Sequence, residues 1–445
     1  MSGGERVDAA LTQANLGFLL PSALCFVAFV CKCAQMSQQG PILVIAGAEP
    51  PLFAVALDEA KMFPVIDTRL ADAASAVERV RPAAVLVASE VATEPGFAPL
   101  ARQIAAQKPY LPLIVVDPAG ALPDNAIPFA QTDDDFDRLL SRLRAALRVR
   151  TLHSTVLRRL DQDPAVQSAI PGHDPAQDAL VLLIGRGATY PALSVALGEQ
   201  IGVVGALSLE AAANHLNVRD LDGIVIGDGF TQRVVDVFLT VLSEDPRFRN
   251  LPVVVTSHRL SSVPDLPNLE GISGDPRRVA ANALPLIRQH AFAAHLGRTL
   301  RSIDAGGLLD PRTGLLTGAA FTRNFAAAVD QTLSQGGGLS VARFAFDQDQ
   351  PRALLDGARI LSRLMRQMDF GAVSQDGSVI VAFAETDLRT ANSIARRLCS
   401  VMRHTSHGKR DVRGEPVVTV ATLAPADSTG SLLARLYEDA RRVAS

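Results

Sequence analysis

The residues of this chain that could do chemistry are a few carboxylates and arginines at the ends of predicted strands and helices. Asp347 closes an apolar run, Asp376 lies in a short polar segment, and Arg366 precedes Asp369 by three positions. A divalent cation such as Mg²⁺ binds several oxygen ligands at once, and the planar fork of an arginine suits phosphate. This region could therefore bind a metal if its carboxylates converge, or recognise an anion if they do not.

A predicted β-hairpin positions Asp376. Residues 370–383 form two apolar runs on either side of Gln375, Asp376, Gly377 and Ser378. Asp-Gly is a strong signal for a two-residue turn, because glycine supplies the positive φ that such a turn requires. Apolar spacing predicts the elements around this hairpin. They are a strand at residues 339–346 and helices at residues 324–333 and 352–367.

Length and composition limit the possible classes of protein. A chain of 445 residues predicts about three domains at roughly 150 residues each. An apolar fraction of 48% with 20% charged residues is typical of a soluble globular protein, which we expect in the cytoplasm. A net charge of -3 and the absence of tryptophan argue against nucleic acid as a partner. The four cysteines form neither a disulfide framework nor a zinc motif.

The first two thirds of the chain contain the same pattern twice. Residues 40–150 and 179–304 each alternate apolar strands with helices, and a segment rich in proline, glycine and small residues at 151–178 predicts a linker between them. Strands that are apolar throughout and alternate with helices predict a parallel sheet covered on both faces. The predicted strands are residues 41–47, 83–88, 113–116, 179–184, 223–226 and 252–256. A long helix at residues 277–303 would close the second copy and lead into residues 305–445.

The N-terminal extension, residues 1–39, contains a mostly apolar run from Leu16 to Cys31. The run is slightly shorter than the roughly 20 residues of a membrane-spanning helix. It could be a short membrane anchor, a hydrophobic helix packed on the first domain, or sequence upstream of the true start. We favour the last interpretation, because Met36 and the residues after it lead directly into the first strand.

Residues 310–321 resemble the opening signature of GGDEF domains, the diguanylate cyclase family. The matching positions are Asp310, Thr313, Gly314, Leu315 and Phe321. The resemblance implies an α+β domain with a mainly antiparallel sheet over residues 305–445. It also implies a strand at residues 417–423 and helices at residues 385–398 and 433–443. In active members, such a domain uses Mg²⁺ to convert GTP into cyclic di-GMP.

The residues that active GGDEF domains need are replaced here. Ala345 stands where the family has a metal-binding aspartate, and Gly377 or Ser378 stands where it has the signature glutamate. The segment between Asp347 and the next strand lacks the stretch with which the family holds guanine. A phosphate-binding lysine is also missing, because Tyr437 is followed by acidic residues. We therefore expect no catalytic residue, metal or cofactor; the alternative is a weak diguanylate cyclase.

Arg366 and Asp369 match the Arg-x-x-Asp inhibitory site at which GGDEF domains bind cyclic di-GMP. The resemblance implies that cyclic di-GMP is a possible ligand at this pair. The alternative is that Arg366 is a solvated helix residue and Asp369 a residue at the helix end.

The repeated pattern of residues 40–150 and 179–304 resembles response-regulator receiver domains, which are flavodoxin-like. Phosphorylation of a receiver requires acidic residues after the first strand, but Gly47 and Gly185 and their neighbours are not acidic. Asp228 is a weak candidate phosphoacceptor, because the alignment puts Gly227 at that position and the neighbouring residue of a strand faces the other way. We expect neither copy to be phosphorylated.

Together these features predict a catalytically inactive bacterial signalling protein with two degenerate receiver domains and a degenerate GGDEF domain. It would act as a scaffold or as a cyclic di-GMP effector. Its expected partners are other signalling proteins, or a second copy that forms a homodimer through the receiver domains. A purely structural dimerisation partner is a further alternative.

Overall fold

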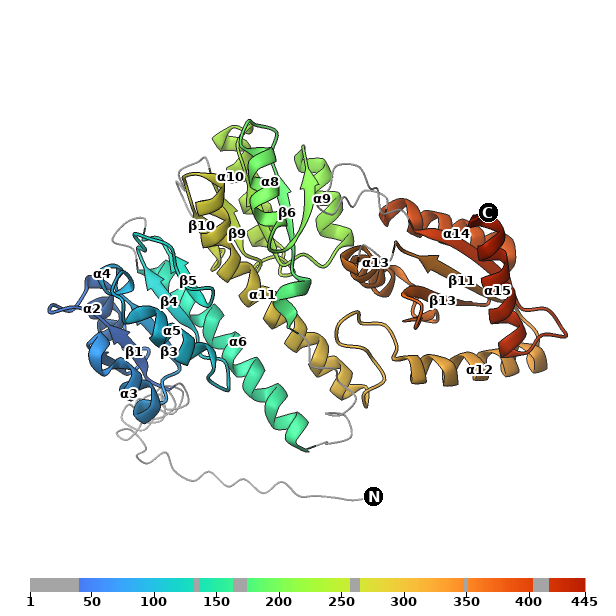
Figure 1. The fold of residues 1–445 in the computed structure, drawn as a ribbon, viewed down its shortest axis with the longest axis horizontal. Helices are drawn as coiled ribbons and strands as arrows, with labels where there is room; N and C mark the ends of the chain where they lie inside the picture. Colours follow the sequence, from blue (N-terminus) through green and yellow to red (C-terminus); the bar gives the residue numbers. More distant parts are fainter. Residues whose placement is uncertain are drawn as a thin grey trace, which may run out of the picture.

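The computed structural model describes residues 40–131, 136–162, 174–256, 265–347, 351–402 and 416–444. These residues form three units, each built around its own sheet (Figure 1). The predicted N-terminal extension and the centre of the predicted linker lie outside the described residues. None of the helices in the described part of the chain combines the length and apolarity that a membrane span requires.

The first unit is a five-stranded parallel sheet in the order β2-β1-β3-β4-β5. This is the flavodoxin-like order of a doubly wound sheet. Its strands are β1 (Ile42–Ile45), β2 (Val65–Thr68), β3 (Ala84–Val87), β4 (Leu113–Val116) and β5 (Ala126–Phe129). Its helices are α2 (Leu52–Glu59), α3 (Leu70–Val80), α4 (Ser89–Ala92), α5 (Phe97–Ala105) and α6 (Asp137–Gln162).

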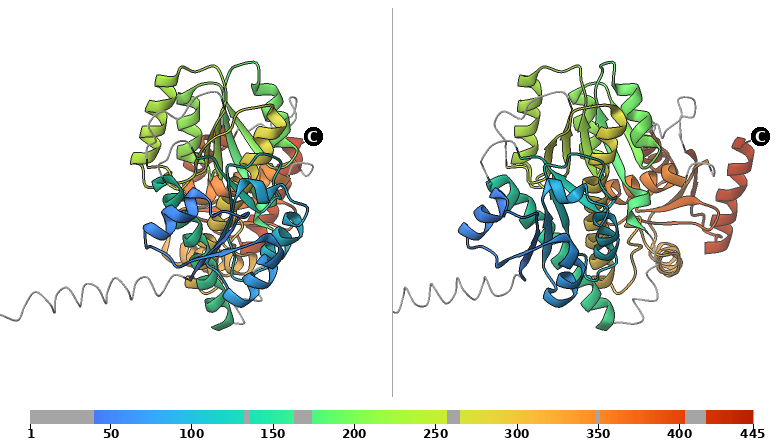
Figure 2. Two further views of the ribbon diagram at one scale, coloured as in Figure 1. Left: turned by 90° about the vertical axis from the view of Figure 1, so that its left-hand side faces the viewer. Right: turned by 60° about the vertical axis from the view of Figure 1, so that its left-hand side comes forward.

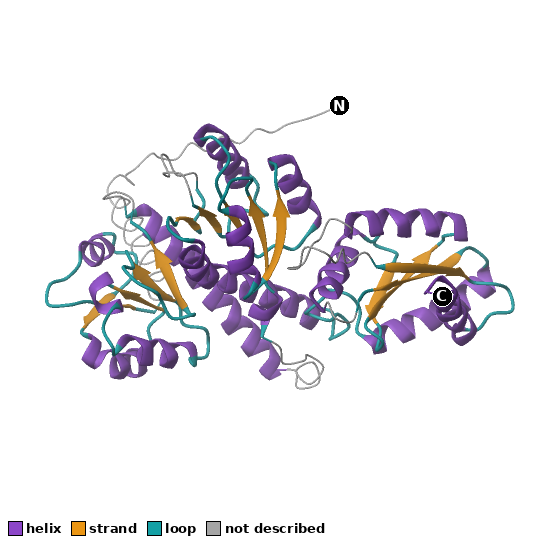
Figure 3. Ribbon diagram, turned by 45° about the horizontal axis from the view of Figure 1, so that its top comes forward, coloured by secondary structure: helices purple, strands orange, loops and turns teal. Residues whose placement is uncertain are grey.

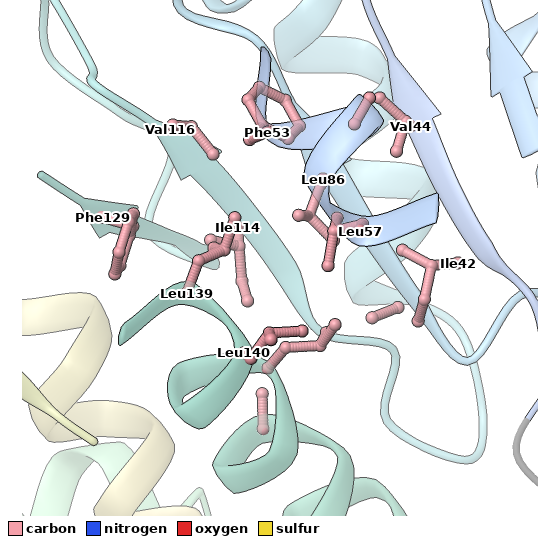
Figure 4. Packing of buried hydrophobic residues seen from close by; sticks show 14 of the residues in the cluster. Ile42, Val44, Phe53, Leu57, Leu86, Ile114, Val116, Phe129, Leu139 and Leu140 are labelled. Atoms are coloured by element: carbon pink, nitrogen blue, oxygen red, sulfur yellow. The ribbon is translucent and has the colours of Figure 1, made fainter. Parts of the chain in front are cut away.

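Helices cover both faces of this sheet, which explains why its central strands are apolar throughout. On one face, Phe53 and Leu57 of α2 and Leu139 of α6 pack with Ile42 and Ile114 of the strands (Figure 4). On the other face, α3 and α5 contribute to a separate core cluster.

The second unit repeats the same strand order, with its parallel strands arranged as β7-β6-β8-β9-β10. Its strands are β6 (Leu180–Ile184), β7 (Gly202–Ala206), β8 (Gly223–Ile226), β9 (Val253–Val255) and β10 (Leu269–Gly271). Its helices are η1 (Pro175–Asp178), α8 (Tyr190–Gly198), α9 (Leu209–Val218), α10 (Gln232–Glu244) and α11 (Pro276–Asp304). The predicted pair of parallel sheets is thus confirmed.

The first and second units meet along α6 and α11, which lie side by side (Figures 1 and 2). The predicted linker begins at residue 151, but α6 continues into it as far as Gln162. It continues because its later turns find an apolar partner: Val156 is buried in one cluster with Leu296 of α11.

A buried ion pair fixes this contact. The Nη2 atom of Arg142 in α6 lies 2.7 Å from the carboxylate of Glu270 in β10, and the two side chains are 0% and 1% exposed. Arg142 also donates to the carbonyl oxygens of Pro128 and Pro267, so its buried donors have acceptors from both units. A buried charge of this kind requires such partners.

The third unit is a four-stranded antiparallel sheet in the order β12-β13-β11-β14. Its strands are β11 (Leu339–Ala345), β12 (Phe370–Val373), β13 (Ser378–Ala384) and β14 (Val417–Thr422). Its helices are α12 (Gly318–Gln335), α13 (Pro351–Leu364), α14 (Leu388–Met402) and α15 (Thr429–Ala444). From β11 onward the order is strand, helix, two strands, helix, strand, so the predicted antiparallel sheet is confirmed.

The sheet of the third unit lies between two pairs of helices (Figure 3). Successive residues of a strand point to opposite faces. Ala342 and Phe344 accordingly share a core with α13 and α14, whereas Val341 packs with α12 and α15.

Candidate functional site

The turn between β12 and β13 is one residue longer than the sequence predicted. Ser374 and Ser378 pair through a hydrogen bond of 2.7 Å from the Ser374 N–H to the Ser378 carbonyl, which leaves Gln375, Asp376 and Gly377 as the loop. The Gly377 N–H donates to the Ser374 carbonyl at 3.1 Å, and Gly377 has φ 75°. This is a three-residue hairpin loop that ends in a left-handed glycine. The hairpin prediction is correct, but the prediction of a two-residue turn is wrong.

The carboxylate of Asp376 is bound by groups of its own domain. The Nη2 and Nε atoms of Arg343 in β11 donate to Asp376 Oδ2 at 2.8 and 3.2 Å. The backbone N–H and the hydroxyl of Ser378 donate to Asp376 Oδ1 at 3.1 and 2.7 Å. The Arg343 guanidinium also lies over the ring of Tyr437, 5.0 Å from its centroid. We call Arg343, Asp376, Ser378 and Tyr437 the turn network.

The turn network keeps Asp376 ionised at neutral pH. Partial burial by itself raises the pKa of Asp376, but the hydrogen bonds from Ser378 and Arg343 and the charge of Arg343 outweigh this effect. The pKa of the carboxyl group is therefore lower than its ordinary value. Arg343 is the cation that balances this charge, and its side chain is only 15% exposed.

The residues here do not fit a divalent cation. Ala345, where the family has a metal-binding aspartate, lies directly opposite Ser378 in the register of β11 and β13. Ser378 is the first residue after the three-residue loop that contains Asp376. The methyl group of Ala345 cannot ligate a metal ion, and the hydroxyl of Ser378 is an uncharged oxygen. The nearby Asp376 carboxylate is already bound by Arg343 and Ser378, so it is not open to a cation. Within the described ranges, no three His, Cys, Asp or Glu residues are grouped so as to hold a metal ion.

Arg366 and Asp369 lie just beyond the end of α13, and only Arg366 is exposed. The carboxylate of Asp369 is buried and accepts from the backbone N–H groups of Arg366 and Ala384, at 3.4 and 3.3 Å. Burial raises the pKa of Asp369, although these hydrogen bonds and the charge of Arg366 oppose the rise. Asp369 thus holds the end of α13 against the end of β13, as the helix-end interpretation describes. The predicted helix over residues 352–367 ends earlier, at Leu364.

Asp228 points toward the loop between β6 and α8. Its carboxylate accepts from the Thr189 hydroxyl at 2.6 Å, and a Cβ atom at Gly187 would clash with it. Strand alternation does not set its direction, because β8 ends at Ile226. The prediction that a one-residue offset turns Asp228 away was therefore wrong. In the same loop, the Nε atom of Arg186 donates to the Gly229 carbonyl. Residues 185–189 of this described loop contain no carboxylate that could accompany Asp228.

Arg343, on which the turn network depends, was not among the predicted site residues. The available signal was a charged residue in the middle of an otherwise apolar strand, since such a residue requires a buried partner. The sequence does not identify Asp376 as that partner, because Asp376 lies in the loop between β12 and β13 and comes close to β11 only in the folded chain.

No family model and no curated protein sequence matches the chain. Among solved structures, the chain is similar to the GGDEF domain of FimX from Pseudomonas aeruginosa, with 17% identity, a TM-score of 0.27, and coverage of 29% of this chain and 90% of that chain. It is also similar to the GGDEF domain of DgcB from Caulobacter crescentus in complex with c-di-GMP, with 16% identity, a TM-score of 0.26, and coverage of 30% and 88%.

A third similar structure is the diguanylate cyclase SiaD in complex with its activator SiaC from Pseudomonas aeruginosa. It has 17% identity and a TM-score of 0.29, and the match covers 33% of this chain and 64% of that chain. At such identities the likeness concerns the fold alone, so the function has to be inferred from the side chains of this protein.

We expect Asp376→Asn to destabilise the protein at pH 7 by about 0.5–1 kcal/mol, the worth of a partly exposed ion pair. The folded-state pKa of Asp376 is lowered, so its contribution is present above the unfolded pKa of about 3.9 and is lost as the pH falls through the lower, folded value. Urea denaturation of both proteins at pH 7 and pH 3.5 measures this difference, with Asp330→Asn on the exposed face of α12 as the control. Equal stability at pH 7, or a difference that grows in acid, would contradict the role given to Arg343.

Proposed function

We propose that the chain is a signalling protein whose residues 305–445 form a GGDEF-like domain that does not make cyclic di-GMP. Residues 40–150 and 179–304 would be degenerate receiver domains. The protein would act through contacts with other signalling proteins or with a second copy of itself. The turn network is the observation that carries this proposal.

Cyclisation of GTP needs metal ions that neutralise the phosphates and activate the attacking hydroxyl. At the corresponding place this chain has the Arg343 guanidinium, with Ala345 and Ser378 in register beside it. A guanidinium can neutralise a phosphate but cannot lower the pKa of a hydroxyl as a bound metal does. Arg343 is moreover already paired with the Asp376 carboxylate. Both observations support a domain that does not cyclise GTP.

The geometry of the first two units favours a permanent arrangement over a phosphorylation switch. The buried Arg142 and Glu270 pair and the α6 and α11 contact hold these units in one arrangement. Asp228 is paired with the Thr189 hydroxyl and lies beside Arg186, whereas Mg²⁺ requires several oxygen ligands at once. A fixed arrangement of the two units suits a scaffold, whereas a phosphorylation switch needs units that change their arrangement.

Purified full-length protein incubated with GTP and Mg²⁺ should form no cyclic di-GMP, as measured by chromatography against an active cyclase assayed in parallel. The physical reason is the missing metal ligands, so the same result is expected across Mg²⁺ concentrations and with Mn²⁺. The alternative is a weak diguanylate cyclase. Product that forms in proportion to protein and disappears in Asp347→Ala would establish that alternative and end the proposal.

A second candidate function is that of a cyclic di-GMP effector. It is favoured by one observation: Arg366 is exposed just beyond the end of α13, and the nearby Met368 is 58% exposed, so the guanidinium is accessible to a ligand. Asp369 would serve as a positioning residue, since its carboxylate already accepts from two backbone N–H groups.

Titration calorimetry with cyclic di-GMP separates an effector from a scaffold. For an effector, Arg366→Ala should weaken binding by roughly tenfold or more, the cost of a charge-assisted hydrogen bond. Arg323→Ala on the exposed face of α12 is the matched control and should bind as the unmodified protein does. If there is no heat, or if Arg366→Ala leaves the heat unchanged, the ligand hypothesis fails and the scaffold remains.

A further inference from the structure

Two adjoining cavities lie where the second unit meets the third. Their volumes are about 390 and 320 Å³, and both are lined by Asp220, Arg298, Arg301 and Arg363. Arg298 and Arg301 come from α11 and Arg363 from α13, while Asp220 lies in the connection between α9 and β8. The volumes fall in the range of pockets for small molecules, and residues of both units must be in place to form them.

Positive charge dominates the smaller cavity. Four guanidinium groups line it, those of Arg298, Arg301, Arg359 and Arg363, against the carboxylates of Asp220 and Asp310. The Asp310 carboxylate already accepts from the Arg312 N–H at 3.0 Å and from the Thr313 hydroxyl at 2.6 Å. Asp220, the other carboxylate of this lining, forms ion pairs with Arg298 and Arg363.

Asp220 is shared between two of these arginines. One of its oxygens lies 3.4 Å from Nη1 of Arg363, and the other lies 3.9 Å from Nη1 of Arg298. Asp222 also lines the larger cavity, and its negative charge acts on Arg298. Two carboxylates, those of Asp220 and Asp222, thus face three guanidinium groups, because Arg301 brings a third positive charge to the same cavities.

Two of the arginines are buried and bonded to uncharged groups. The side chain of Arg298 is 7% exposed, and its Nε atom donates to the Pro311 carbonyl at 2.8 Å. Arg359 is buried and donates to the carbonyls of Arg312 and Asp178 at 3.0 and 3.3 Å. A carbonyl satisfies a donor but does not balance its charge. Burial, together with the neighbouring charge of Arg359, lowers the pKa of Arg298 to about 10, which is the response of a crowded cation.

We propose that these cavities bind a small anion that carries two or more phosphate groups, held by Arg298, Arg301 and Arg363. Arginine forks match phosphate oxygens in geometry and charge. Two adjoining spaces with arginines in common suit a diphosphate better than a single phosphate. The bound anion would contact α11 and α13 at once and would tie the third unit to the second. Neither the residues of the turn network nor Arg366 line these cavities. The proposal therefore does not depend on the resemblance to diguanylate cyclases.

Calorimetry of the full chain with sodium pyrophosphate at low salt tests the site, with inorganic phosphate and sulfate at matched ionic strength as competitors. We expect saturable binding of one pyrophosphate per chain, stronger than that of either competitor. Arg301→Gln and Arg363→Gln should each weaken it by roughly tenfold or more. Arg301 is exposed and Arg363 is partly exposed, so these variants should fold, which circular dichroism can verify.

Two further variants give the experiment its controls. Arg323→Gln, on the exposed face of α12, should bind pyrophosphate as the unmodified chain does. Arg366→Ala tests whether the anion binds instead at the surface beyond the end of α13. Absence of saturable binding would overturn the proposal, as would unchanged binding in both Arg301→Gln and Arg363→Gln. An equal loss in Arg323→Gln would show general charge attraction and would also overturn it. Loss in Arg366→Ala alone would assign the anion to that surface and refute the site proposed here.

Discussion

Helix α11 is the element on which the relative positions of the three units depend. Its first turns close the second unit, where Val279, Ala283 and Ile287 are buried against sheet residues. Leu286, on another face of the same helix, belongs to the core of the first unit. Near its end, Arg298 donates to the Pro311 carbonyl, at the start of the third unit. One helix that is packed into several cores cannot move without disturbing all of them.

Charged contacts join the second and third units. Arg219 and Asp356 form an ion pair with side chains 0% and 6% exposed, and Arg312 lies 2.7 Å from the carboxylate of Asp178. Replacing one partner of a buried pair leaves an uncompensated charge, at a cost of roughly 3–5 kcal/mol. Such pairs specify orientation because they require a particular geometry. Arg298, Arg301 and Arg363 outnumber the carboxylates beside them and make the cavities at the same junction positive.

The function proposed for the third unit follows from the same balance of charge. Metal-dependent phosphoryl chemistry needs carboxylates that converge on a cation. Here Arg343 and Asp376 neutralise each other, and Asp369 is engaged by backbone N–H groups. The polar groups of this region therefore hold the fold together. Recognition of partners or anions remains open to the exposed arginines around it.

Sequence patterns predicted the central strands well because those strands are buried on both faces and apolar throughout. All four edge strands of the two parallel sheets, β2, β5, β7 and β10, were missed. The physical reasons differ: β2 is only partly buried, and β5 contains Pro128. Strand β7 contains Gly202 and Gly205, and β10 has three residues, one of them Glu270. The end of α6 was misplaced because its stability comes from contact with α11, which local composition does not reveal.

The candidate site was predicted only in part. The turn around Asp376 was located from its Asp-Gly pair, but its length was wrong, because the loop is closed by the pairing of Ser374 with Ser378. Arg366 and Asp369 were identified as a pair, whereas the burial of Asp369 depends on β13, a distant segment. Long-range partners of this kind are set by the packed fold and not by spacing along the chain.

We propose that the described residues of the third unit form no site for a divalent cation, because the Asp376 carboxylate is held by Arg343 and Ser378. Electron paramagnetic resonance of Mn²⁺ titrated into the full chain, without nucleotide, tests this claim most directly. The account predicts that the signal of free Mn²⁺ matches that of buffer throughout the titration. A loss of signal that saturates at one or two ions per chain and is abolished by Asp347→Ala would contradict it.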